Sequence, residues 1–311
     1  MLRIASHVGD ADAIGLPEDL RAEVVVEAVR VKADVDPSAR FDAVLTVPWG
    51  TPNLPALLGR GVTWVHVTGT GVDAFPFELL GDRVLTNSRG ASAVPISEWV
   101  LATMLAFEKD LPGVWERISP ERWREGIELG GLAGRRVAVI GLGGIGARVA
   151  RLALAFDVEV VGVRRRPEPS PVPGVEVVAD LDVALAGAHH VVVAAPLTAA
   201  TRDLVGREAF AAMTPGVHLV NVARGGLVDQ DALRVALDDG TVARASLDAV
   251  EPEPLPAGHW LYDHPAVRLS PHVSWSGPGA IATLMEDFVT NCRRRLAGEP
   301  LVNVIDPTVG Y

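Results

Sequence analysis

Cysteine is almost absent from this chain, since Cys292 is the single one among 311 residues. One thiol can form neither an internal disulfide nor a thiolate metal cluster. The histidine pairs offer no metal site either, because neither His189-His190 nor His259 with His264 has the i, i+4 spacing of a helical zinc site. We therefore expect no metal and no disulfide.

Long apolar runs are also absent. No stretch approaches the roughly 18 residues of a membrane span, and the first residues include Asp10 and Asp12 where a signal peptide needs an apolar core. Positive charge is scarce, because 28 Lys and Arg against 39 Asp and Glu give a net charge of −11. That balance argues against nucleic acid or an anionic membrane as a partner, although local basic residues can still bind an anionic substrate. The sequence predicts a soluble, cytoplasmic protein.

What the chain has in quantity is an alternation of short apolar runs and helical patterns, with 49% hydrophobic and 22% charged residues. A chain of this length is expected to form two domains, and the alternation predicts α/β units with parallel sheets. Helical patterns cover about 92–108, with Ser92 at the cap position, and about 280–296. The expected strands are Leu2–Ala5, Val24–Val26, Ala43–Val47, Thr63–Val67, Val84–Thr86, Val137–Ile140, Val158–Val163, Val191–Ala194, Val217–Asn221, Ala243–Leu247 and Val267–Leu269.

The most informative stretch is the strand pattern Val137–Ile140, which is followed by Gly-Leu-Gly-Gly-Ile-Gly and an alanine-rich helical pattern. This is the order of a dinucleotide-binding turn. The first glycine permits the tight turn, the second lets the backbone approach a pyrophosphate, and the third, Gly146, allows close helix–strand packing. The alternative is a glycine-rich loop that only packs a sheet. The cofactor contacts expected at the start of the helix are Gly141, Gly143, Gly144 and Ile145.

The residues after the second strand of this half bear on the choice of cofactor. An acidic residue about 20 positions past the glycines would bond the ribose 2′-hydroxyl of NAD, but Asp157 and Glu159 lie at the wrong end of the strand. Arg164-Arg165-Arg166 follows the strand instead, and a guanidinium matches a phosphate. The sequence thus favours NADP(H), with NAD(H) also possible. The alternative is an arginine run that forms a solvated turn.

Three further stretches each follow a predicted strand, namely Asn221–Gly226, Leu247–Leu255 and Ser270–Trp275. With the glycine turn they resemble the D-isomer-specific 2-hydroxyacid dehydrogenases, whose pattern is A-R-G-x after a strand, then L-D-V-x-x-x-E-P-L, then P-H. The resemblance covers nearly the whole chain. Other segments similar to the family are Ala195–Arg202 (its P-L-T-x-x-T-R loop), Thr68–Asp73 (its substrate-carboxylate loop) and Gly298–Tyr311 (its closing tail).

The residue types in these stretches suit the reduction of a 2-oxo acid. Arg224 can clamp the carboxylate and the carbonyl of the substrate, helped by the backbone amides of Thr70 and Gly71. His272 can donate the proton, because imidazole titrates near neutral pH, and Glu253 would raise its pKa by hydrogen bonding. Taken singly, each catalytic candidate also has a non-catalytic interpretation. Arg224 could form an interdomain salt bridge, His272 could close a strand, and Glu253 could be an exposed loop acid.

The resemblance also implies an architecture of two flavodoxin- or Rossmann-like domains, each a doubly wound parallel sheet, with a cleft between them that closes on NADPH. The substrate domain would comprise 1–91 plus 282–311, and the dinucleotide-binding domain would comprise 92–281. Family members are usually dimers through the cofactor domain, so a homodimer is expected, with the Ile96–Met104 helix face as the contact. Asp248 would bind the nicotinamide carboxamide. The other implied cofactor contacts are Pro196, Thr201, Val222, Ala223 and His272.

Two tryptophans bear on the size of the substrate. Trp49 lies in a loop after a predicted strand, and Trp275 lies three residues after His272. They would either narrow the pocket to small acids or stack on an aromatic substrate. The predicted substrate-binding residues are Trp49, Gly69, Thr70, Gly71, Arg224 and Trp275.

We predict an oxidoreductase that reduces a small 2-oxo acid, of the glyoxylate/hydroxypyruvate type, to the D-2-hydroxy acid with NADPH. A reductase of larger or aromatic 2-oxo acids is one alternative. A formate-dehydrogenase-like member is another, although that group carries glutamine where this chain has Glu253. From a different class, a dinucleotide-sensing, corepressor-like interaction protein is compatible with an intact catalytic set. The sequence leaves open the physiological substrate, the direction of the reaction and the strength of the NADPH preference.

Overall fold

The computed structural model describes residues 1–115, 128–165 and 168–310. The chain divides into two compact units: unit 1 comprises Met1–Ser92 and Gly277–Tyr311, and unit 2 comprises Ala93–Ser276. The expected boundary at 281/282 would cut a helix, α8 (Ala280–Leu296), which is continuous across residue 281. The observed boundary precedes that helix and leaves it wholly within unit 1.

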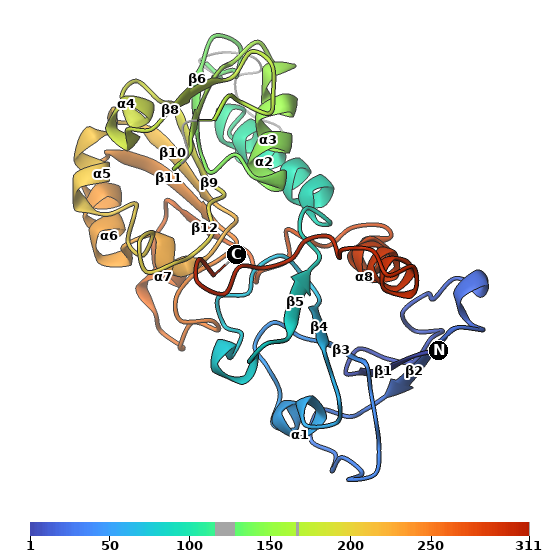
Figure 1. Ribbon diagram of the computed structural model, residues 1–311. Coiled ribbons are helices and arrows are strands. Elements are labelled where there is room, and N and C mark those ends of the chain that lie inside the picture. The colour runs from blue at the N-terminus through green and yellow to red at the C-terminus, as the bar shows by residue number, and fades with distance from the viewer. Residues whose placement is uncertain (116–127, 166–167, 311) are drawn as a thin grey trace. The chain divides into compact units, whose positions relative to one another are not determined.

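Unit 1 is built on a five-stranded sheet in the order β2-β1-β3-β4-β5, and every neighbouring pair is parallel. This is the flavodoxin-like order, whose topological switch point lies between β1 and β3. The five strands are drawn in blue to cyan in Figure 1. They are β1 (Leu2–Ser6), β2 (Val24–Ala28), β3 (Ala43–Thr46), β4 (Trp64–Val67) and β5 (Val84–Asn87).

Both faces of this sheet are buried. Successive side chains of a strand point to opposite faces, and in this sheet both sets pack in apolar clusters. Ile4 shares an apolar cluster with Phe288 of α8, whereas the next residue, Ala5, shares another with Leu57 of α1. The Phe288 ring stacks on Trp64, with ring centroids 5.6 Å apart and 22° between the planes. The helical elements of unit 1 are α1 (Leu54–Leu58), α8 and two 3-10 turns, η1 (Glu18–Leu20) and η2 (Phe77–Leu79).

Unit 2 is built on a seven-stranded parallel sheet in the order β12-β11-β10-β9-β6-β7-β8 (Figure 1). Counted from β6, this is the Rossmann order with a further strand beyond β11, and the order reverses between β6 and β9. The seven strands are β6 (Arg136–Ile140), β7 (Glu159–Val163), β8 (Glu176–Val178), β9 (His190–Val193), β10 (Val217–Asn221), β11 (Val242–Leu247) and β12 (Val267–Leu269).

Helices cover both faces of this second sheet. Val139 shares a cluster with residues of α2 and α3, whereas the neighbouring Ile140 shares one with residues of α4, α5 and α6. The expected doubly wound, parallel α/β architecture is therefore confirmed in each unit. The helical elements of unit 2 are α2 (Ala93–Glu108), α3 (Gly144–Leu154), α4 (Leu181–Leu185), α5 (Arg207–Ala212), η3 (Gly225–Leu227), α6 (Gln230–Asp238) and α7 (Trp260–Asp263).

The face of α2 that we expected to contact a second copy of the chain is buried within unit 2. Ile96, Val100 and Met104 are buried in the core of unit 2, where α2 packs along α3. The apolar stripe is therefore satisfied inside one chain, and the prediction that it forms a dimer contact is wrong. A helical stripe read from sequence cannot distinguish burial against the same chain from burial against another.

All eleven expected strands are present, with ends that differ by at most a few residues. The described residues also contain β8, which the sequence did not predict. It is a three-residue edge strand whose side chains are exposed or half-buried, so it has too little alternation to be recognised.

Candidate active site

The glycine turn lies between β6 and α3, at the point where the strand order reverses. Gly141 has φ +96, and a Cβ there would lie 2.8 Å from the backbone of Ala194 and Ala195. A Cβ on Gly146 would lie 1.8 Å from the carbonyl oxygen of Gly141, so the helix can approach the turn only without one. These two glycines are required by the fold itself.

Gly143 is different, because a Cβ there would meet nothing within 4 Å. It occupies the cap position of α3, where no side chain caps the helix. The first amides of an α-helix have no partner within the helix and carry its positive end, which suits an anion. The bare backbone at Gly143, followed by Gly144 and Ile145 in the first turn, thus fits a pyrophosphate. Packing within the chain does not require a glycine at position 143, whereas close approach of a pyrophosphate does.

His272 and Glu253 are brought together from loops that follow β12 and β11. The Nδ1 atom of His272 lies 2.8 Å from Oε2 of Glu253, and Oε1 of Glu253 accepts a 2.9 Å hydrogen bond from the amide of Val250. Because the strands are parallel, their carboxyl ends lie along one edge of the sheet, which is also the edge of the glycine turn. The predicted pairing is therefore present in the structure.

The electrostatics of the pair suit a proton donor. The hydrogen bond to Glu253 raises the pKa of His272 above its ordinary value, against the opposing effects of burial and of the Arg224 charge. Burial by itself would raise the pKa of Glu253, but the hydrogen bonds from His272 and Val250 outweigh it, so this pKa lies below its usual value. The pairing with Glu253 thus favours the charged form of the imidazole.

The backbone around His272 is tightly held. His272 itself has φ +53, a left-handed conformation that a residue with a side chain adopts at some cost. Its carbonyl accepts a 2.9 Å hydrogen bond from the indole of Trp275. The carboxylate of Asp248, 2% exposed, accepts bonds from the amides of Val273 and Ser274, both 2.9 Å.

Asp248 therefore has a role that the sequence did not suggest. Its carboxylate also accepts a hydrogen bond from the hydroxyl of Ser270, so both oxygens are bonded to the loop that carries His272. The structure shows Asp248 as the anchor of that loop, and a contact with the nicotinamide carboxamide stays a prediction. Ser270 and Ser274 were missed, although a serine on each side of His272 was the available signal.

Arg224 follows β10, where its backbone is extended at the start of η3. One guanidinium nitrogen donates to the carbonyl of Ala223 over 2.9 Å. Its positive charge acts on both Glu253 and His272, which places the cation close to the acid–base pair. Val222, also predicted to contact the cofactor, is 6% exposed and packs in the core, and its contact with the cofactor stays a prediction.

The loop after β9 folds back on itself. The hydroxyl of Thr201 donates to the carbonyl of Pro196 over 2.7 Å and accepts from the amide of Thr198 over 2.8 Å. This closes the loop at the carboxyl end of β9, next to the glycine turn. Thr201 thus shapes the loop, and cofactor contacts by Pro196 and Thr201 stay predictions.

Arg164 ends β7 as expected, but it has a partner in its own chain. Its guanidinium lies 3.1 Å from the carboxylate of Glu168 and donates to the carbonyl of Pro169 over 3.0 Å. It also lines a cavity of about 400 Å³ beside β8. A carboxylate that holds the guanidinium competes with a 2′-phosphate for it, so Glu168 is a residue that the sequence reading missed. Arg165 is exposed, and Arg166 lies outside the described residues.

The remaining predicted substrate contacts belong to unit 1. Trp49 lies in the loop after β3 and is 67% exposed. Gly69, with φ +96, Thr70 and Gly71 form the loop after β4. Both loops lie at the carboxyl edge of the unit 1 sheet, because the strands are parallel. The structure therefore places these residues at one ligand-binding edge and the catalytic pair at another.

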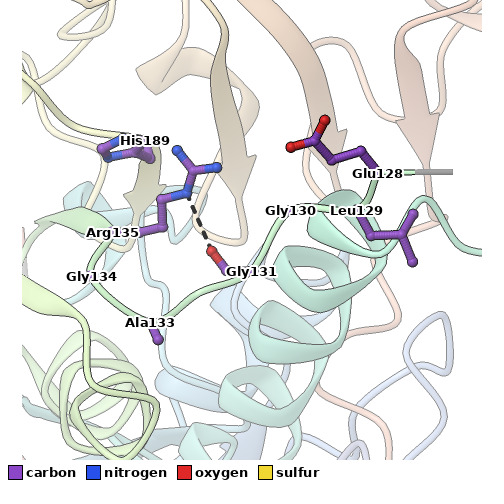
Figure 2. A pocket seen from close by; sticks show the side chains of 8 residues that line it. All are labelled: Glu128, Leu129, Gly130, Gly131, Ala133, Gly134, Arg135 and His189. Atoms are coloured by element: carbon purple, nitrogen blue, oxygen red, sulfur yellow. Dashed lines mark hydrogen bonds between the residues drawn. The ribbon is translucent and has the colours of Figure 1, made fainter. Parts of the chain in front are cut away.

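A pocket of about 520 Å³ lies elsewhere in unit 2 and is shown in Figure 2. It borders the amino ends of β6 and β9, and inside it Arg135 donates to the carbonyl of Gly131 over 3.2 Å. Ligands of such sheets bind at the carboxyl ends of the strands, so we do not assign the chemistry to this pocket. It is lined by Glu128, Leu129, Gly130, Gly131, Ala133, Gly134, Arg135 and His189.

The described residues contain no group of three or more His, Cys, Asp or Glu side chains arranged to hold a metal ion. Within the same part of the chain, no helix has both the length and the apolar character needed to cross a bilayer.

Comparisons with known proteins identify the class. The family described as D-isomer specific 2-hydroxyacid dehydrogenase, NAD binding domain, matches residues 101–274. Glyoxylate/hydroxypyruvate reductase B of Pectobacterium carotovorum subsp. carotovorum is 30% identical over 279 residues, which cover 88% of this chain and 81% of that protein. The chain therefore belongs to the D-isomer specific 2-hydroxyacid dehydrogenase family, whose members are oxidoreductases acting on CH–OH donors. The predicted family is confirmed.

Two further similar proteins show the range of proteins that resemble this chain. D-3-phosphoglycerate dehydrogenase of Methanocaldococcus jannaschii is 30% identical over 305 residues, or 95% of this chain, but the chain spans only 57% of that protein's length. Among solved structures, a D-isomer specific 2-hydroxyacid dehydrogenase of Xanthobacter autotrophicus Py2, in complex with NADPH and MES, has a TM-score of 0.83 and 30% identity. The match covers 100% of this chain and 99% of that one. The names of the two sequence relatives thus differ in substrate, and the Xanthobacter structure has the same fold as this chain.

Proposed function

We propose that this protein reduces a small 2-oxo acid, of the glyoxylate/hydroxypyruvate type, to the D-2-hydroxy acid with NADPH. The observation that carries the proposal is the 2.8 Å pairing of His272 with Glu253 at the same sheet edge as the glycine turn. The reductase from Pectobacterium supports the substrate class, and the NADPH in the Xanthobacter structure supports the cofactor.

The residues of this chain supply binding and the proton. Because Nδ1 of His272 donates to Glu253, the proton that the substrate receives is the one on Nε2. Arg224 pairs with the substrate carboxylate and polarises the carbonyl, while the amides of Thr70 and Gly71 bind the same carboxylate. When bound, NADPH supplies the hydride. The carbonyl carbon thus gains a hydride, its oxygen gains the proton of His272, and the imidazole is left neutral.

This assignment gives each unit a role. Unit 1 binds the substrate carboxylate through the loop of Gly69, Thr70 and Gly71, and unit 2 binds the dinucleotide. Closure of the units on NADPH, a homodimer and a cytoplasmic location belong to the same proposal. Scattering profiles of the protein with and without both ligands test the closure, since unchanged profiles contradict it.

A second candidate substrate is a larger or aromatic 2-oxo acid. The observation that favours it is the 67% exposure of Trp49 at the carboxyl edge of unit 1, where a flat ring is available for stacking. Trp275 is less available, because it is half-buried and packs against the core of unit 2.

The direct test follows the absorbance of NADPH, and separately of NADH, with glyoxylate, hydroxypyruvate, pyruvate and phenylpyruvate. We expect fast oxidation of NADPH with glyoxylate or hydroxypyruvate, and its loss in His272→Ala. His264→Ala is the matched control, because His264 is also paired with a carboxylate of unit 2, Asp238, at 3.4 Å. Tight NADPH binding without turnover of any of the four acids would contradict the proposal and favour the dinucleotide-sensing alternative.

The cofactor preference has its own test. Arg164→Asp combined with Arg165→Ala is expected to weaken NADPH much more than NADH. Glu168→Gln removes the competing carboxylate and is expected to tighten NADPH while leaving NADH unchanged. Equal effects on both cofactors would show that the arginines form only a solvated turn.

A further inference from the structure

Asn221 is the last residue of β10 and has no part in the chemistry described above, although it begins the segment that carries Arg224. Its side chain is 1% exposed and makes three hydrogen bonds. The amide oxygen accepts from the backbone of Ala223 over 3.1 Å. The amide nitrogen donates to the carbonyl of Arg224 over 2.9 Å and to the carbonyl of Ala249 over 3.2 Å. One buried side chain thus joins the loop after β10 to the loop after β11.

The second loop leads directly to the acid–base pair. Ala249 precedes Val250, whose amide holds Oε1 of Glu253, and Oε2 of Glu253 holds His272. A continuous path of hydrogen bonds and backbone therefore runs from Asn221 to the imidazole. The same side chain fixes the carbonyl of Arg224 at the other end.

The backbones of the two loops pack closely together, so their relative position depends on the hydrogen bonds of Asn221. A Cβ on Gly225 would lie 2.0 Å from the carbonyl carbon of Val250, so the loops touch backbone to backbone. Other hydrogen bonds also join these regions, since the amide of Asp248 donates to the carbonyl of Asn221 over 2.9 Å and the side chain of Gln230 donates to the carbonyl of Glu251. The side-chain bonds of Asn221 are buried, and buried hydrogen bonds to backbone are costly to lose.

We propose that Asn221 is a positioning residue, which fixes Arg224 relative to the Glu253–His272 pair and so sets the geometry of the substrate anion against the proton donor. The assignment rests on the proposed reduction of a 2-oxo acid. It assigns Asn221 no contact with substrate or cofactor, and its effect is transmitted through the carbonyls of Arg224 and Ala249.

The test is Asn221→Asp, which keeps the shape and the acceptor for Ala223 but removes both donated bonds. Misplacement of reacting groups by about 1 Å costs on the order of 100-fold, so we expect kcat/KM for the 2-oxo acid to fall about 100-fold. The dinucleotide Kd is expected to stay unchanged, because the glycine turn is untouched. The pH midpoint assigned to His272 is read from Asn221→Ser, because the carboxylate of Asn221→Asp would itself raise the pKa of the imidazole. In Asn221→Ser the midpoint is expected to move down, since a loosened Glu253 raises that pKa less.

Asn291→Asp is the matched control. Asn291 is 0% exposed in unit 1, where it bonds the backbone of Val302 in both directions, at 3.1 and 2.8 Å. It is expected to lower thermal stability as Asn221→Asp does, with no change in kcat/KM or in the pH midpoint. If Asn221→Asp does not fold, Asn221→Ser, which retains one donor, takes its place.

A fall in kcat/KM together with a lower pH midpoint, both absent from the control, supports the assignment. Kinetics and pH profile equal to those of the wild type overturn it. If the wild-type enzyme turns over none of the 2-oxo acids, the proposed function fails. The titration of His272, followed by NMR without substrate, then decides the positioning role: a midpoint that is the same in Asn221→Ser and wild type refutes it.

Discussion

The buried histidines of unit 2 make the stability of this protein sensitive to acid. His190 and His218, both 0% exposed, lie in neighbouring strands with their Nδ1 atoms 3.2 Å apart. Nε2 of His190 lies 3.0 Å from the carboxylate of Glu108, and Nε2 of His218 lies 2.9 Å from the hydroxyl of Ser246. Phe107 stacks on the His218 ring, with centroids 4.7 Å apart.

This geometry fixes where the protons are. A carboxylate only accepts, so His190 donates from Nε2 to Glu108 and its Nδ1 carries a lone pair. His218 must then donate from Nδ1 to His190, and its Nε2 accepts from Ser246. Both rings are fully satisfied in the neutral form, and an added proton would set two donors against each other.

The pKa values give the sign and size of the effect. Burial, with the nearby charges of His189 and Arg135, lowers the pKa of His190 to about 3 from the ordinary 6.5. Burial, with His190 and Arg244 nearby, also lowers the pKa of His218. The unfolded chain binds these protons near pH 6.5 and the folded chain does not, so stability is complete above that pH and is lost as the pH falls. Well below pH 6.5 the loss approaches about 1.4 kcal/mol per pH unit for each ring that stays neutral, and for His190 alone it amounts to about 2 kcal/mol between pH 7.5 and 5.

The assay is urea unfolding of the wild type and of His218→Leu across this pH range. Between pH 6 and 5 we expect the slope of unfolding free energy against pH to fall by about 1.2 kcal/mol per pH unit in the variant, because the unfolded chain then binds one proton fewer relative to the folded chain. Nitrogen–proton NMR of the folded wild type should show His190 as the Nε2–H tautomer and His218 as the Nδ1–H tautomer at pH 6. Opposite tautomers, a ring that titrates above pH 6, or an unchanged slope would refute this reasoning.

Three further predictions follow from single substitutions. Glu253→Gln replaces the charged acceptor that raises the pKa of His272 with a neutral amide, so the pH above which reduction declines is expected to fall, as measured by kcat/KM against pH; an unchanged pH profile would show that Glu253 does not set the pKa of His272. Phe288→Ala empties a fully buried site and is expected to cost about 3–5 kcal/mol in urea unfolding; a cost below 1 kcal/mol would contradict its place in the core. Gly143→Ala is expected to keep the melting temperature and weaken NADPH binding, whereas Gly146→Ala lowers both; equal effects would show that the space beside Gly143 is not for a ligand.

Much of the site follows from local sequence. The glycine spacing is typical of a strand–turn–helix, and the structure has one there with φ +96 at Gly141. The turn depends on backbone conformation and strand periodicity, which act over a few residues and are visible in a short window of the chain. The pairing of Glu253 with His272 agrees with what the family resemblance implied for the loops after β11 and β12.

What only the tertiary structure decided are the partners of individual side chains. The sequence shows an arginine after β7 but not that Glu168 holds it, and an aspartate after β11 but not that its carboxylate anchors the loop of His272. It shows the apolar stripe of Ile96–Met104 but not that α3 covers it. A hydrogen bond or a packed face depends on where two segments meet in space, and that position is set by the balance of burial over the whole unit rather than by either segment alone.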